Sequence, residues 1–96
     1  MVRKGIFIIY NISLGGKIEE LLNKCEIGEF TIIKGVIGAG KAGGKRFNNE
    51  VYPGENDMVF IATDETHFIK FKSTLHALYE EYKSDGITYF SFTMDG

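Results

Sequence analysis

Cysteine and histidine are scarce in this chain of 96 residues, which has one cysteine, Cys25, and two histidines, His67 and His76. A single cysteine excludes a disulfide bond within the chain. Structural zinc sites use four cysteine or histidine ligands. The two histidines are nine residues apart in a predicted helix, so they lie on roughly opposite faces and do not share a metal within a monomer. We therefore expect no metal site.

Excess positive charge and long apolar runs are also missing. The chain has 11 Lys and Arg against 13 Asp and Glu, which gives a formal net charge of −2. Nucleic-acid-binding domains usually carry a basic face, so this balance argues against a nucleic-acid partner. The apolar run IFIIY, residues 6–10, is too short to span a bilayer or to form a secretion signal. We expect a cytoplasmic protein without membrane insertion.

Apolar residues, at 44% of the chain, are sufficient for a hydrophobic core, and the length suits one domain over residues 1–96. Short β-branched and aromatic runs predict strands. Apolar residues spaced by three and four predict helices. The expected elements are strands at 4–12, 29–37, 56–63 and 87–94, and helices at 17–25 and from 64 to just before Gly86.

This β-α-β-β-α-β order predicts an α+β, ferredoxin-like sandwich. Two split βαβ units give a four-stranded antiparallel sheet with both helices on one face. Alternate Ile, Phe and Tyr side chains of the strands would then lie on the open face of the sheet. A monomer rarely exposes such a patch to water, so we expect a partner there, most simply another copy of the chain.

The stretch GVIGAGKAGGKR, residues 35–46, matches two phosphate-binding patterns incompletely. The Walker A pattern fails at Ala42, and neither it nor the dinucleotide pattern is followed by a helix, which both need. Glycines still allow backbone N–H groups to form an anion-binding nest, with Lys41, Lys45 and Arg46 adding positive charge. A solvated loop is the equal alternative. The connection over residues 38–55 is long for a hairpin, which favours a function.

The fold and this loop resemble the PII-like signalling superfamily, the relatives of the nitrogen regulatory PII proteins. The pattern G-x-G-x-x-G-G-x-R…P-G-x-N of its small uncharacterised members is matched here by eight residues: Gly38, Gly40, Gly43, Gly44, Arg46, Pro53, Gly54 and Asn56. The resemblance implies a homotrimer that binds a small anionic effector, such as an adenine nucleotide, in clefts between subunits. It also implies that the loop contacts a target protein in signal transduction.

Under this interpretation the candidate ligand-binding residues are Gly35, Gly38, Gly40, Lys41, Gly43, Gly44, Lys45 and Arg46, with Tyr52 as a residue that either stacks on the ligand or packs across an interface. We expect no catalytic residue and no enzyme activity, because no nucleophile–base pattern is present. Two alternatives stay open. One is a trimeric metal-tolerance protein of the CutA type, and the other is a protein-interaction module without a small ligand.

Overall fold

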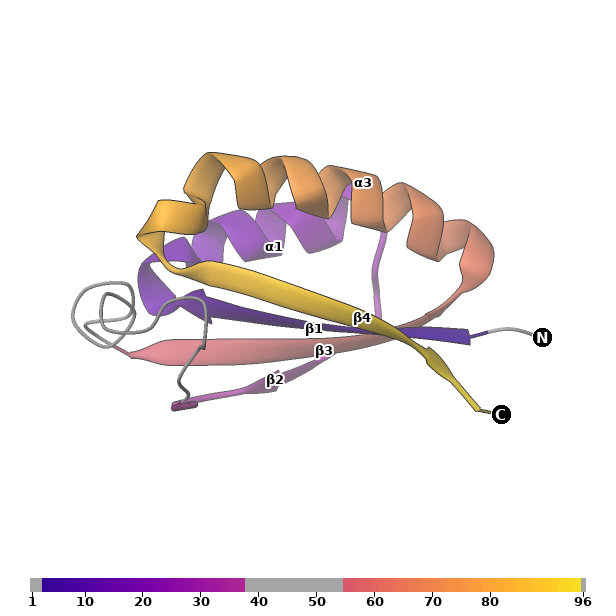
Figure 1. Ribbon diagram of the computed structural model, residues 1–96, viewed down its shortest axis with the longest axis horizontal. Coiled ribbons are helices and arrows are strands. Elements are labelled where there is room, and N and C mark those ends of the chain that lie inside the picture. Colours follow the sequence, from indigo (N-terminus) through magenta and orange to yellow (C-terminus); the bar gives the residue numbers. More distant parts are fainter. Residues whose placement is uncertain (1–2, 38–54, 96) are drawn as a thin grey trace.

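The computed structural model describes residues 3–37 and 55–95 (Figure 1). Its strands are β1 (Arg3–Asn11), β2 (Thr31–Ile33), β3 (Asn56–Asp64) and β4 (Ile87–Met94). They form one antiparallel sheet in the order β2-β3-β1-β4. The helices α1 (Gly15–Lys24) and α3 (Glu65–Tyr82) lie side by side on the same face of this sheet. The predicted ferredoxin-like sandwich is therefore confirmed.

Short 3₁₀ turns connect the main elements, namely η1 (Ile12–Leu14) before α1 and η3 (Lys83–Asp85) before β4. The Asn11 side chain accepts a hydrogen bond from the Ser13 amide and so caps η1. Asp64 caps α3 by accepting from the His67 amide, as its position at the predicted helix start indicated. Gly86 follows η3 with a positive φ of 101°, which allows the chain to turn into β4.

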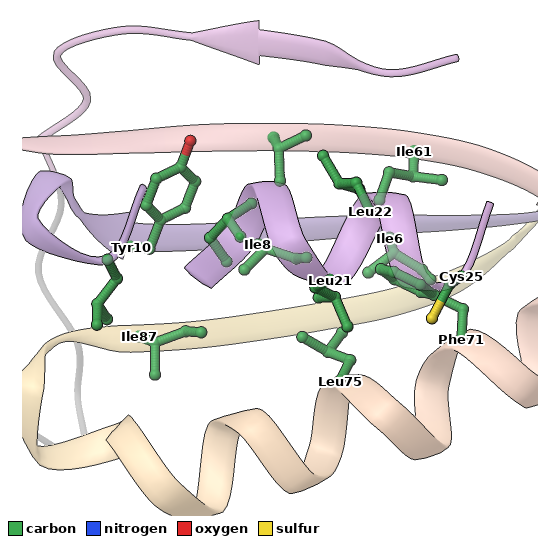
Figure 2. Packing of buried hydrophobic residues seen from close by; sticks show 13 residues of the cluster. Ile6, Ile8, Tyr10, Leu21, Leu22, Cys25, Ile61, Phe71, Leu75 and Ile87 are labelled. Atoms are coloured by element: carbon green, nitrogen blue, oxygen red, sulfur yellow. The ribbon is translucent and has the colours of Figure 1, made fainter. Parts of the chain in front are cut away.

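The core lies between the sheet and the two helices. Figure 2 shows Ile6 and Ile8 of β1 in one cluster with Leu21 and Leu22 of α1 and with Phe71 of α3. Cys25 is buried in this cluster. Each fully buried aliphatic or aromatic side chain contributes about 1.5–3 kcal/mol relative to an exposed one. The core therefore fixes the sheet against both helices and leaves the other sheet face open.

Strand β2 is shorter than the strand predicted over residues 29–37. It pairs with β3 alone, through Thr31, Ile32 and Ile33, and all three are exposed. Gly35 has a positive φ of 68°, which breaks the extended conformation. The Val36 amide then donates to the Asn56 carbonyl at 2.8 Å, so the chain stays beside β3 after the strand has ended.

Candidate functional site

The chain leaves β2 beside the first residues of β3, and we call this place the loop root: Lys34, Gly35, Val36, Asn56 and Asp57. The Gly35 amide donates to Oδ1 of Asp57 at 3.2 Å. The Lys34 ammonium donates to Oδ2 of the same carboxylate at 3.1 Å. One aspartate therefore holds two consecutive residues at the point where the segment 38–54 begins.

Asp57 lies on the face of β3 that the helices cover, and it is only 5% exposed. Its partner across the β1–β3 ladder is Tyr10, which belongs to the core. Burial alone would raise the pKa of the Asp57 carboxyl, but the hydrogen bonds from Lys34 and Gly35 and the charge of Lys34 outweigh it and lower that pKa. Burial, with the nearby Asp57 charge adding to it, raises the pKa of the Tyr10 phenol. The loop root thus contains a buried, ionised carboxylate.

Of the predicted ligand-binding residues, Gly35 lies in the loop root, where its positive φ fits the glycine preference. The other eight lie outside the described residues: Gly38, Gly40, Lys41, Gly43, Gly44, Lys45, Arg46 and Tyr52. Lys34 and Asp57 are not among the site residues that the sequence predicts. The signal for Asp57 was its inward position in β3, since it shares the alternation of Val59 and Ile61.

The open face of the sheet, opposite the helices, is apolar. Phe7, Phe60 and Phe92 form a cluster whose ring centroids are 4.9 to 6.4 Å apart. Beside them, Phe90 is 52% exposed and Ile33 43% exposed. The apolar surface expected on this face is therefore present, and it continues from β4 to β2 across the strand order of the sheet.

The two histidines have separate partners. His67 Nδ1 is 3.0 Å from Asp64 Oδ2 at the start of α3. His76 Nδ1 is 2.8 Å from the Tyr89 hydroxyl, and its Nε2 is 3.6 Å from Glu80. Across residues 3–37 and 55–95, no three His, Cys, Asp or Glu side chains are grouped so that they could hold a metal ion.

An open pocket of about 380 Å³ lies at the end of β3 away from the loop root. Its lining includes Arg3, Gly28, Thr63 and His67. Since Asp57 and Thr63 are six residues apart along β3, about 20 Å separate this pocket from the loop root.

Within the described part of the chain, no helix has the length and apolar character needed to cross a membrane.

No protein-family model matches this sequence, and no curated protein matches it. Several solved structures are similar to this chain. CPII, a nitrogen regulatory PII-like protein from Thiomonas intermedia K12 bound to ADP, AMP and bicarbonate, is similar with a TM-score of 0.70 at 16% identity, over 98% of this chain and 91% of that chain. CPII bound to ADP and bicarbonate gives a TM-score of 0.72 at 16% identity, over 98% and 87%.

A PII-like signaling protein from Thermus thermophilus is similar with a TM-score of 0.65 at 13% identity, over 98% of this chain and 87% of that chain. Sequence identities this low show a shared fold and nothing more. The alignments nevertheless extend over nearly the whole chain, and the resemblance inferred from the sequence pointed to the same group of proteins. The chain therefore shares the fold of these PII-like proteins.

Proposed function

We propose that this protein is a PII-like regulatory protein that binds a small anionic effector, an adenine nucleotide in the first instance. The observation that carries the proposal is the likeness, over 98% of the chain, to CPII, whose structure is bound to ADP, AMP and bicarbonate. CPII is a nitrogen regulatory protein by name, so the proposed role is regulation, with nitrogen metabolism as its first candidate setting, rather than catalysis. The proposed location is the cytoplasm.

The proposed binding residues extend from the loop root into the glycine-rich segment. Gly35, Gly38, Gly40, Gly43 and Gly44 would supply backbone N–H groups to an anion. Lys41, Lys45 and Arg46 would add charge-assisted hydrogen bonds to phosphate or carboxylate oxygens. Tyr52 is proposed as a stacking residue. An effector that binds one conformation of this segment more tightly than another would change the affinity for a target protein.

We further propose a homotrimer, with the effector in clefts between subunits. The support within the structure is the open apolar face of the sheet, which exposes aromatic side chains to water in a single copy. Burial of this face against other copies would remove that exposure. The proposed trimer would also bring the loop roots of different subunits into one assembly.

Isothermal titration calorimetry with ADP, ATP, AMP, cyclic AMP and bicarbonate tests the effector. We expect at least one adenine nucleotide to bind with a dissociation constant below about 1 mM, because the similar CPII structure is bound to ADP and AMP. Replacement of Lys41, Lys45 and Arg46 together by Ala should weaken that binding at least tenfold, since charge-assisted hydrogen bonds are lost. Binding weaker than millimolar for every compound would contradict the proposal.

The same triple variant distinguishes an effector-binding regulator from a pure interaction module. Affinity capture with the wild type and the variant, with and without ADP, measures target binding. A regulator should show a partner whose capture changes with ADP. A partner that the triple variant loses, while ADP has no effect on the wild type, would instead identify an interaction module.

A further inference from the structure

Asp57 is the one charged side chain that is buried among the described residues. A buried carboxylate is costly unless hydrogen bonds and an opposite charge compensate it. Both compensating donors, the Gly35 amide and the Lys34 ammonium, lie on the chain that leaves β2, more than twenty residues away in sequence. The burial of Asp57 therefore depends on the position of the loop root.

The position of the loop root also depends on Asp57. Gly35 stands at φ 68°, and its amide has its hydrogen bond to Asp57 at the turn out of the strand. Without the carboxylate, the hydrogen bond from the Val36 amide to the Asn56 carbonyl is the one that would still join residues 34–36 to β3 within the described residues. The Asp57 side chain thus sets the direction in which the chain leaves the sheet.

Lys34 has a different environment from its partner. Its side chain is 81% exposed, whereas that of Asp57 is 6% exposed. An ammonium group has three N–H donors, and Asp57 is its one hydrogen-bond acceptor within residues 3–37 and 55–95. Lys34 can therefore donate to an anion in solution while it remains beside Asp57.

We propose that Asp57 is the positioning residue of the loop root and that Lys34 is the contact of the root with a phosphate or carboxylate group of the ligand. The ligand contact of Lys34 rests on the proposed function, whereas the positioning role of Asp57 does not. In this arrangement the buried carboxylate keeps a lysine, rather than a glycine alone, at the base of the effector site. The ligand class it selects is a small molecule that carries a phosphate or carboxylate group.

Amide hydrogen exchange, followed by NMR, tests the positioning role without any ligand. In Asp57→Ala the Gly35 amide should exchange at least tenfold faster than in the wild type. In Asp57→Asn, which keeps a neutral acceptor oxygen, the increase should be smaller but measurable, because carboxylates accept stronger hydrogen bonds than amides do. The Ile61 amide in the core of β3 is the internal reference, since a general loss of stability would accelerate both amides.

Gly35 exchange equal to the wild type, or an increase matched by Ile61, overturns the positioning role. If Asp57→Ala does not fold, Asp57→Asn decides the question by the same two amides. The isosteric variant preserves the side-chain volume, so a change restricted to Gly35 reports the lost charge rather than a packing defect.

Calorimetry with ADP and with adenosine tests the ligand contact. Lys34→Gln should weaken ADP binding about tenfold, the usual loss for one charge-assisted hydrogen bond, and leave adenosine binding unchanged. Lys70→Gln, at an exposed position on α3, is the matched control and should bind ADP like the wild type. Equal ADP affinity in Lys34→Gln and the wild type overturns the Lys34 contact.

The two proposals can fail separately. If the wild type binds none of the compounds in the titration series, the effector function and the Lys34 contact are wrong together. The exchange of Gly35 still decides whether Asp57 positions the loop root. If ADP binds and Lys34→Gln has no effect, the proposed function stands and the inferred contact is wrong.

Discussion

Among single residues, Asp57 combines deep burial with a full negative charge. Its pKa is lowered because the hydrogen bonds from Lys34 and Gly35 outweigh the effect of burial. A carboxyl whose pKa is lower in the folded chain stabilises the fold above its unfolded pKa of about 3.9. That contribution is lost as the pH falls through the folded value. As the pH falls, the hydrogen bonds of Asp57 to Lys34 and Gly35 should therefore be lost before the hydrophobic core unfolds.

We predict that Asp57→Asn unfolds with a smaller pH dependence than the wild type below about pH 4. Urea unfolding at a series of pH values measures the free energy of both. Above pH 5 the two curves should run parallel, because the carboxyl is ionised there in both states. Asp85→Asn, at an exposed position in η3, controls for the removal of one negative charge. Parallel curves down to pH 2 would contradict the prediction.

Gly5 is a second residue whose neighbour restricts it, here on the open face of the sheet. The Phe92 ring lies against it, and a Cβ added at Gly5 would be 2.5 Å from Cζ and 2.8 Å from Cε2 of that ring. Gly5→Ala should therefore displace the ring, but it should destabilise the fold by about 1 kcal/mol at most, because Phe92 is 40% exposed and its ring can turn into solvent. Gly16→Ala in α1, where nothing lies within 4 Å, should instead stabilise by about 0.5–1 kcal/mol. Chemical denaturation of both variants measures whether the free energy of unfolding falls in Gly5→Ala and rises in Gly16→Ala.

At the scale of elements, the end of α1 is a Schellman motif with an unusual residue. The Ile27 amide donates to the Leu22 carbonyl, and the Glu26 amide donates to the Asn23 carbonyl. Glu26 occupies the left-handed position with φ 58°, where glycine is the common choice. We predict that Glu26→Gly stabilises the protein by about 0.5–1 kcal/mol, because the left-handed conformation is costly for a residue with a Cβ.

Thermal or urea unfolding measures this gain. Glu29→Gly, which removes an exposed acid three residues further along the chain, is the control for lost charge and should not stabilise. A loss of stability in Glu26→Gly would show that the Glu26 side chain supports the α1–β2 connection in some way that the hydrogen bonds do not reveal.

The elements also show how far sequence patterns can predict this fold. The strand at 87–94 was predicted with its observed bounds, because alternation and the preceding Gly86 are both local signals. Strand β2 was predicted too long, because its length depends on how far β3 can pair with it. Asp57 was missed as a site residue for a related reason. An acid at the start of an apolar strand resembles a solvated end, and only the tertiary arrangement places it beside Tyr10 and Lys34.

For the whole molecule, the proposed trimer depends on the open face of the sheet. If copies associate through this face, a polar side chain at its most exposed aromatic position should weaken the contact. We predict that Phe90→Gln shifts the proposed trimer toward smaller species, because Phe90 is 52% exposed in a single copy. Ile69→Gln, at a 64% exposed position on α3, should leave the mass unchanged. Size-exclusion chromatography with light scattering gives the mass of each.

A wild-type mass of one chain would contradict the trimer, and an unaltered mass in Phe90→Gln would place the contact elsewhere. The stability of the separated chain should be nearly unaffected by this substitution, since the Phe90 ring is largely outside the core. A change of mass without a change of fold would therefore identify the sheet face as an assembly surface.

The register of the sheet places Arg3 opposite both Asp64 and Met94, while Asn11 lies opposite Asn56. Both ends of the described chain are consequently at one end of the sheet, and the loop root is at the other, about 25 Å away along β1 (Figure 1). A fluorophore, biotin or sensor-surface tether attached at either terminus would stand clear of Lys34 and Asp57. Binding measurements on immobilised protein can thus report the loop root without obstruction from the attachment.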